Sequence, residues 1–583
     1  MSFIASEAAD RDPMPPSQPP PAPRRPATEF VPDLAAAAAL IAALILLYHQ
    51  VLRLWWTHDD VFVLHYVSEH RPWQYCLEPQ VWRQLPMRML TPLLFLSMHL
   101  DLGLFGADPR AQYAHQLAAA ALAFLGFYAV LRLWLPPATA ALGTGVALAG
   151  APAASLMQLP TTRHYLEGLV LAALSIVFFV RALPRPSREA ERPPRPGVLA
   201  LSLSALCYLA ASLAKEVFVP LVLFFPWLAP GGVGRRLRLS APHFGAFLFY
   251  LGWRLYMLGT LAGGYGWSVG AADLPRLAAA LPLKMVRAMI GPSPRAGTLL
   301  LAALLTGAVA ACYRRRRAAL LLLAAAAAAT GPILPASTEM EPRWAFPLWL
   351  ILAAALAFGC DRLAHGHRGS RAAAVLLATL AAIAAVAANR QGWAESYAAA
   401  ERTSVENRAL LGLPAGEYLR HPAGPPASLH ELQWLRQAYL GQPAGGGWFF
   451  DDLFLCTLPP AARVREYDPR SRRVEDITAR APGLRAGHCG SIRENAPLSA
   501  DLLLAQGNLR WRLGPYPSGN YSLVVAGGQD AYPVPPAGGF QVPALSAVTL
   551  QFHYASPAGW HTYSPPLSVK AGPGGHVVFA RHL

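Results

Sequence analysis

Two adjacent carboxylates follow closely on the first long apolar run of this chain. Asp59 and Asp60 come shortly after residues 34–54, and the pair Trp55-Trp56 precedes them. Tryptophan side chains favour the headgroup layer of a membrane, so the two carboxylates are expected just outside the hydrocarbon. A carboxylate there could act as general base on a substrate carried by a lipid. The pair could equally begin an ordinary loop, and the local sequence leaves both interpretations open.

Further ionisable residues stand near the ends of later apolar runs, on the side of the membrane where this pair is expected. They are Lys215, Glu216, Arg254, Tyr256, Glu341 and Arg343. A cation in such a place can hold a phosphate group, and arginine does so with two parallel hydrogen bonds. It can also extend its charged end to the membrane surface, which is the simpler interpretation for any one of these residues alone.

Lys215 and Glu216 form the tip of a short hairpin between the apolar runs 198–214 and 217–229. Each run is shorter than the roughly 20 residues that a membrane-spanning helix needs, so the tip is expected slightly below the membrane surface. Ionisable residues at that depth face a cavity or each other. A functional site and a neutralised pair that merely caps the hairpin therefore both stay open.

The composition predicts a polytopic α-helical membrane protein. Of the 583 residues, 54% are hydrophobic and only 14% are charged, which is typical of a chain with many membrane spans. About eleven spans are expected, at residues 34–54, 111–131, 138–158, 164–182, 198–214, 217–229, 241–259, 297–312, 318–335, 344–360 and 371–388. The apolar residues 92–105 are too few to cross and predict a helix in the membrane interface.

The net charge of +16 comes mainly from arginine clusters in every second connection between apolar runs, such as residues 314–317. Such clusters mark the cytoplasmic side, so they indicate topology and no nucleic-acid partner. The N-terminus is then cytoplasmic, and the C-terminus and the Asp59-Asp60 pair lie outside. Heavy use of Ala, Arg, Pro and Gly suggests a bacterial protein, which places the chain in the inner membrane with a periplasmic C-terminus.

Four parts of the chain are expected. They are a disordered, proline-rich cytoplasmic tail (1–31), a transmembrane domain (32–390), its long first outer loop (56–110) with two amphipathic helices (61–69 and 81–104), and a periplasmic C-terminal domain (391–583). The last part divides into a helical connector (391–445) and a β-rich portion (446–583), whose short strands predict an antiparallel sandwich. Cys456 and Cys489 in that portion could form a disulfide in an oxidising compartment or stay as two thiols.

Several short motifs together resemble the GT-C superfamily of polytopic glycosyltransferases. They are His58-Asp59-Asp60, the loop ending Leu104-Phe105-Gly106-Ala107-Asp108-Pro109, Lys215-Glu216, Trp253-Arg254-Leu255-Tyr256 and Glu341-Pro342-Arg343-Trp344. The nearest relatives are the protein O-mannosyltransferases and the aminoarabinose transferases that act on lipid A. The resemblance covers residues 31–390, and the C-terminal domain resembles no family that we can name.

The resemblance implies a sugar donor linked to a polyprenyl phosphate. Asp59 or Asp60 would then be the general base, with Asp59 favoured, or would hold a divalent metal cation as in the oligosaccharyltransferase branch. Lys215, Arg254 and Arg343 would bind the donor phosphate. The supporting residues would be Glu216, which orients Lys215, together with His58, Glu341 and Tyr256.

The expected function is thus glycosyl transfer to an acceptor glycan, lipid or protein. Membrane lipids are expected as further partners. A transporter would need paired repeats or discontinuous helices with polar groups at mid-membrane, and neither is visible in the sequence. A non-catalytic envelope protein that binds a glycan through its C-terminal domain would leave Asp59 and Asp60 unexplained. A polymerase or ligase that joins lipid-linked chains is a further alternative.

Overall fold

The structure is a computed structural model of the full chain. It describes residues 30–57, 59–83, 85, 89–183, 197–261, 274–291, 293–336, 340–414, 416–421, 447–505, 508–525, 530–541, 547–570 and 579–582. The expected disordered tail lies outside these residues except for its last two positions. Most of residues 412–445 of the expected helical connector also lie outside them.

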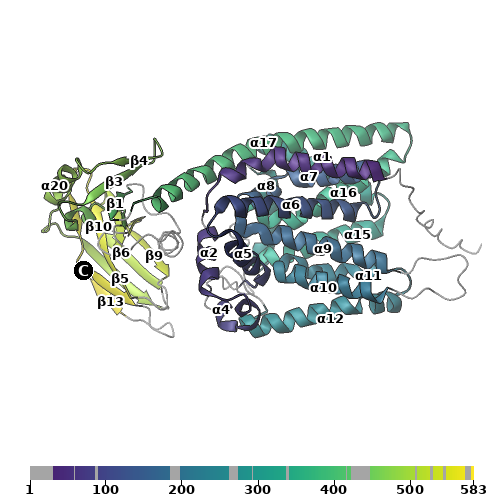
Figure 1. Cartoon of the computed structure of the whole chain (residues 1–583), viewed down its shortest axis with the longest axis horizontal. Helices are drawn as coiled ribbons and strands as arrows, with labels where there is room; N and C mark the ends of the chain where they lie inside the picture. Colours follow the sequence, from purple (N-terminus) through teal and green to yellow (C-terminus); the bar gives the residue numbers. More distant parts are fainter. Residues whose placement is uncertain are drawn as a thin grey trace, which may run out of the picture.

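A bundle of helices forms the larger part of the molecule, and in Figure 1 they lie side by side along the long axis. The helices are α1 (Phe30–Tyr48), η2 (His49–Arg53), α6 (Pro109–Leu131), α7 (Pro137–Ala149), α8 (Ala151–Met157), η3 (Pro160–Thr162), α9 (Arg163–Ala182), α10 (Val198–Ala214), η4 (Glu216–Phe224), α11 (Phe225–Leu228), α12 (Val233–Leu258), α13 (Leu274–Ile290), α14 (Pro294–Cys312), α15 (Arg316–Thr330), η5 (Gly331–Ala336), η6 (Pro342–Ala345), α16 (Phe346–Ala364) and α17 (Arg368–Leu411).

All eleven expected apolar runs are helical in the structure. By length and composition, however, only seven helices of the described residues can each cross a membrane, or up to eight if α7 and α8, bent by 60° at their junction, count as one. The runs that fall short include α10 with 17 residues and η4 with 9 residues. The chain is a multi-pass membrane protein, but the number of about eleven spans is not confirmed.

Small residues allow the helices to pack closely. A Cβ atom added to Gly359 of α16 would lie 2.1 Å from the carbonyl oxygen of Gly307 on α14, so neither helix could carry a larger residue at this contact. Glycine at helix contacts is typical of membrane proteins, where close backbone approach replaces the hydrophobic effect. Proline at the first turn of α6, α7 and α14 begins these helices without losing a hydrogen bond.

Short helices close the end of the bundle that faces the strands, which is its left end in Figure 1. They are α2 (Asp59–Glu69), α3 (Gln74–Leu77), α4 (Pro79–Arg83) and α5 (Pro92–Phe105). The expected helix 61–69 corresponds to α2, but the expected helix 81–104 is wrong, because α4 and α5 are separate helices. Proline at the first turn of α5 explains its start, since that residue has no N–H for a continuing helix.

Contacts between side chains and backbone hold this cap on the bundle. The indole N–H of Trp253 on α12 donates to the Cys76 carbonyl over 3.0 Å, and Arg83 donates to the carbonyl groups of Tyr256 and Met257 over 2.8 and 3.2 Å. The interface helix expected at residues 92–105 is α5. Helix α13 was not expected, because its residues were assigned to an outer loop.

Helix α17 joins the bundle to the C-terminal strands and is continuous for 44 residues. The expected boundary between domains at residue 390 falls inside it. Strands β1 (Glu417–Arg420), β2 (Gly447–Phe449), β3 (Arg463–Asp468) and β4 (Arg473–Asp476) form one sheet in the order β2-β1-β3-β4. Strand β1 is parallel to β2 and β3, so this sheet is mixed and not antiparallel as expected.

The remaining strands form the expected antiparallel sandwich. One sheet contains β7 (Asn520–Val525), β8 (Asp530–Val534), β10 (Ala547–Ala555), β11 (His561–Tyr563) and β12 (Leu567–Lys570), and the other contains β5 (Ser499–Ala505), β6 (Asn508–Gly514), β9 (Ala537–Gln541) and β13 (Phe579–His582). Their inner faces share one core, in which Trp511 of the second sheet meets Phe552 of the first. The sandwich is therefore a single packed unit.

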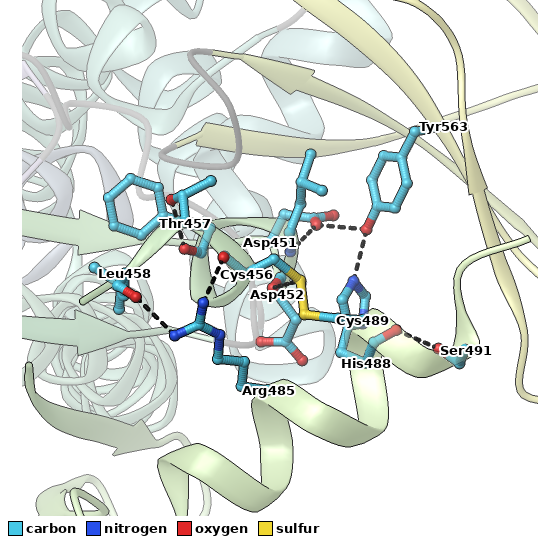
Figure 2. The surroundings of a disulfide bond; sticks show 12 residues. Asp451, Asp452, Cys456, Thr457, Leu458, Arg485, His488, Cys489, Ser491 and Tyr563 are labelled. Carbon is cyan, nitrogen blue, oxygen red and sulfur yellow. Dashed lines mark hydrogen bonds between the residues drawn. A yellow bond between two sulfur atoms is a disulfide. The ribbon is translucent and has the colours of Figure 1, made fainter. Parts of the chain in front are cut away.

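The expected β-rich portion 446–583 also contains short helices. In the segment 448–457 only the start belongs to β2, and the end is the short helix α19 (Leu453–Thr457). A disulfide joins Cys456 at the end of α19 to Cys489 on α20 (Ala481–Ser491), with their Cα atoms 6.1 Å apart. Figure 2 shows Arg485 beside it, donating to the carbonyls of Leu458 and Cys456 over 2.8 and 3.0 Å.

We expect replacement of both disulfide cysteines by serine to destabilise the C-terminal domain by about 2–4 kcal/mol, since the crosslink restricts the unfolded chain. Thermal unfolding of the purified protein in detergent, followed by circular dichroism at wavelengths dominated by strands, measures this loss. The matched control is Cys312→Ser, which removes a free cysteine. An unchanged melting temperature in the double variant would contradict the expectation.

Candidate functional site

The carboxylate of Asp60 is buried and fully engaged with neighbouring donors. The amide and hydroxyl of Thr161 on η3 donate to its Oδ1 over 3.0 and 2.9 Å, and the Thr57 amide donates to its Oδ2 over 3.2 Å. Its exposed fraction is 0%. Burial raises the pKa of Asp60 to about 7, although these hydrogen bonds lower it in part. Asp60 therefore fastens the start of α2 to the bundle and, being buried, is not accessible to a substrate.

Asp59, the preceding residue, has a different environment. Its side chain is 50% exposed, and its Oδ2 lies 3.8 Å from Nη2 of Arg343. The same guanidinium forms a second ion pair, in which Nε of Arg343 lies 2.5 Å from Oε2 of Glu341. The structure thus distinguishes the two aspartates, because only Asp59 is accessible and lies beside a cation.

A second group of charges lies at the junction of α10 and η4. Oε1 of Glu216 accepts from Nη1 of Arg254 and from the Leu90 amide, over 3.2 Å each, and its Oε2 lies 3.6 Å from Nζ of Lys215. Arg254 is held further by the Tyr250 hydroxyl at 3.2 Å. Lys215 and Arg254 are both buried. Glu216 therefore aligns two cations that come from separate helices.

The two groups of charges lie close enough to act on each other electrostatically. The charge of Arg343 acts on Lys215, and the imidazole of His164 experiences the charges of Lys215, Glu216 and Arg343. His164 is buried, its Nδ1 lies 2.7 Å from the Thr161 carbonyl, and its Nε2 has no hydrogen-bond partner among the described residues. The predicted residues Asp59, Lys215, Glu216, Arg254, Glu341 and Arg343 thus come together at one end of the bundle.

Sequence reasoning missed His164 and Thr161. The signal available was a run of polar residues, 161–164, directly before an apolar run. Arg163 in that run explains why it is held in place. Its Nη1 donates to Oδ2 of buried Asp101 over 2.6 Å, and its Nη2 donates to the Gln112 carbonyl over 3.0 Å.

Two predicted supporting residues are not part of this arrangement as described. The Tyr256 side chain is 58% exposed, and only its carbonyl makes a contact near the site, as the acceptor of Arg83. His58 lies outside the described residues.

An apolar groove of about 270 Å³ lies within the bundle. Its walls come from α6, α9, η4, α15 and α16, and include Leu169, Val217, Ala329 and Phe346. Val217 directly follows Glu216, and Phe346 is three residues after Arg343. Two lining residues are thus close in sequence to charged residues of the site, and the lining suits a hydrocarbon chain.

The residues present do not fit a divalent metal. All three hydrogen bonds to Asp60 come from donors that a metal ion would have to displace. No group of three or more His, Cys, Asp or Glu side chains that could hold a metal ion occurs in the described part of the chain. Asp59 is therefore paired with a guanidinium cation in this site and has no set of fellow ligands.

This arrangement can perform one kind of chemistry well. A half-exposed carboxylate can take a proton, and neighbouring cations can stabilise a negative charge that develops within a few ångströms of it. Lys215 and Arg254 are buried, which strengthens the electrostatic interactions of their charges.

We expect ionisation of Asp60 to make stability pH-dependent. A carboxyl group whose pKa is raised in the folded protein stabilises the fold fully at low pH, and this contribution is lost as the pH rises to about 7. Between pH 5 and pH 7 the loss is about 2 kcal/mol. Thermal unfolding of wild type and of Asp60→Asn at several pH values measures it as a gap that shrinks with rising pH.

The matched control is Asp59→Asn, at the exposed neighbour, which should keep the pH dependence of the wild type. Identical pH dependence in wild type and Asp60→Asn would show that Asp60 does not titrate in this range.

The chain is similar in structure to polytopic membrane enzymes. ArnT from Cupriavidus metallidurans in the apo state is 15% identical, with 78% of this chain and 95% of that chain covered and a TM-score of 0.40. The same protein bound to undecaprenyl phosphate gives 14% identity and a TM-score of 0.37, with the same coverage. The archaeal oligosaccharyltransferase AglB from Archaeoglobus fulgidus, in complex with an inhibitory peptide and a dolichol-phosphate, is 12% identical, covers 87% of this chain and 74% of its own, and has a TM-score of 0.43.

No protein-family model and no curated protein matches the sequence. At these identities and TM-scores the structural likeness carries no argument about function. The function of this chain is therefore argued from its own site.

Proposed function

We propose that the protein is a membrane glycosyltransferase that moves a sugar from a polyprenyl-phosphate donor to an acceptor hydroxyl, with Asp59 as the general base. The observation that carries the proposal is the position of Asp59 beside Arg343, with Lys215 and Arg254 held by Glu216 at the same end of the bundle. An apolar groove within the bundle, lined by residues next in sequence to this site, supports it. A lipid phosphate needs both features, cations for its head and a dry channel for its tail.

In the proposed reaction the acceptor oxygen attacks the anomeric carbon of the donor sugar. The bond from that oxygen to carbon forms while the bond from carbon to the phosphate oxygen breaks. The electron pair stays on the phosphate, where Lys215 and Arg343 stabilise the added charge. The acceptor proton passes to the carboxylate of Asp59, and attack from the face opposite the phosphate inverts the anomeric centre.

Glu216 and Glu341 position the cations in this scheme. Each of these carboxylates holds an arginine. With Asp59 included and buried Asp60 left out, the site has three carboxylates and three cations, which are Lys215, Arg254 and Arg343. A phosphate that enters the site therefore meets cations already oriented by their partners, so little ordering is required on binding.

The distribution of arginines supports a site on the outer, periplasmic face of a bacterial inner membrane. Helix α12 carries Arg235, Arg236 and Arg238 in its first turns and Arg254 near its end, beside the proposed site. The cluster at its start is of the kind that marks the cytoplasmic side. The site at the other end of the same helix would then face outward.

The decisive experiment is to incubate the purified protein in lipid with a panel of polyprenyl-phosphate sugars and to follow donor loss by mass spectrometry. We expect Asp59→Asn to lower turnover about 10²–10⁴-fold without unfolding the protein, because positioned base catalysis contributes that much. Asp60→Asn should act on stability more than on turnover.

The matched control for Asp59→Asn is Glu341→Gln, since Glu341 is 48% exposed and pairs with the same Arg343. Its loss should be much smaller. Full turnover in Asp59→Asn would refute the role of this residue, and loss of all activity in both variants would indicate that only the orientation of Arg343 matters.

The groove gives a separate expectation. Ala329→Phe should fill part of it and weaken the binding of long polyprenyl donors at least several-fold, with little effect on a donor that has one or two isoprene units. Ala327→Phe, on the exposed face of the same helix, is the matched control. Donor binding is measured by mass spectrometry of the detergent-solubilised complex. Equal binding of long donors by both variants would place the lipid tail elsewhere.

A further inference from the structure

A second cavity, of about 520 Å³, lies outside the proposed donor site. It is lined by His49 and Arg53 of η2, by Trp55, by Asp108 and Arg110 at the start of α6, and by Arg408 near the end of α17. It shares no lining residue with the apolar groove or with the group around Lys215 and Arg343.

The cavity carries a net positive charge. Three arginines face one carboxylate, that of Asp108, which also accepts from the Arg110 amide over 2.9 Å to cap α6. No carboxylate of the described residues forms an ion pair with Arg53, Arg110 or Arg408. The cavity is thus left with an excess of two cations, which attracts an anionic phosphate group.

Trp55 supplies a rigid wall of the cavity. The guanidinium of Arg408 lies 5.0 Å from the centre of its ring. The Trp55 amide donates a hydrogen bond of 3.0 Å to Ser404 Oγ on α17, so the wall is fixed to that helix.

The position of the cavity indicates where its ligand comes from. One wall is the end of the span Val31–Arg53, and another is the start of the span Pro109–Leu131, so the cavity lies where two spans leave the hydrocarbon. Only 17% of the apolar window of the first span is buried inside the protein. Lipid therefore surrounds that helix, and lipid headgroups lie at the height of the cavity.

We propose that this cavity binds the phosphate group of a membrane lipid, as a resident lipid site apart from the donor site. Arginines bind phosphate oxygens with paired hydrogen bonds. The bound headgroup connects η2, the start of α6 and the end of α17, which all line this cavity. The lipid therefore stabilises the segment that leads to Asp59, and its binding requires no sugar donor.

The test uses the full chain, purified in a neutral detergent, and counts retained lipids by native mass spectrometry. The probes are phosphatidylglycerol and phosphatidylcholine with short acyl chains, and inorganic phosphate alone. We expect the wild type to retain one phosphatidylglycerol in preference to phosphatidylcholine. The single changes Arg53→Gln, Arg110→Gln and Arg408→Gln should each weaken retention about fivefold.

Arg402→Gln is the matched control, because Arg402 is an exposed arginine on α17 outside the cavity. It should retain the lipid as the wild type does, and thermal unfolding of each variant shows that the bundle is intact. Equal retention of phosphatidylglycerol by the wild type and by a variant that combines all three arginine changes would overturn the proposal. Equal thermal stabilisation of the protein by inorganic phosphate and by phosphatidylglycerol would also overturn it, since the site would then bind a soluble anion.

Discussion

The geometry of the site depends on the buried carboxylate of Asp60. A buried carboxylate is tolerated only when its oxygens accept hydrogen bonds, and the donors here come from Thr57 on one side and Thr161 on the other. This requirement places the first turn of α2 against η3. The exposed neighbour Asp59 then projects toward Arg343, because consecutive residues of a helix point in different directions. The buried ion pair between Arg163 and Asp101 holds η3 in place as well, because Arg163 directly follows it.

Glu216 has the corresponding role for the cations. It accepts from Arg254 of α12 and from the backbone at Leu90, and it lies 3.6 Å from Lys215 of its own hairpin. Three segments far apart in the sequence thus meet on one side chain. Glu216 lies at the tip of a hairpin that is short, as the sequence predicts, with 17 residues in α10 and 9 in η4. Two full-length spans would carry the tip further out, away from Arg254. The alternative interpretation, a pair that only neutralises itself, leaves the contact with Arg254 without a reason.

Much of this arrangement was predictable because it follows from chain periodicity and charge. Every apolar run became helical, and the outer ends of alternate runs brought Asp59, Lys215 and Arg343 to one end of the bundle, as sidedness requires. Tyr256 could not be placed the same way, because it lies two residues after Arg254 and so on the other face of α12. His164 was missed because a histidine at the start of an apolar run has no spacing that identifies it. The short helix α19 cannot be distinguished from a strand by its sequence, since apolar runs of that length suit both structures.

Helix α17 has a mechanical consequence. Its 44 residues span about 66 Å at 1.5 Å per residue, roughly twice the thickness of the hydrocarbon core. The first half packs in the bundle, and the second half is joined to Trp55 and Trp56 by Ser404 and Asn407 before it reaches the strands, as Figure 1 allows one to follow. The helix is therefore a stiff connection that is anchored at the segment leading to Asp59. We expect a force on the C-terminal domain, such as that of a large bound molecule, to reach this segment through the helix.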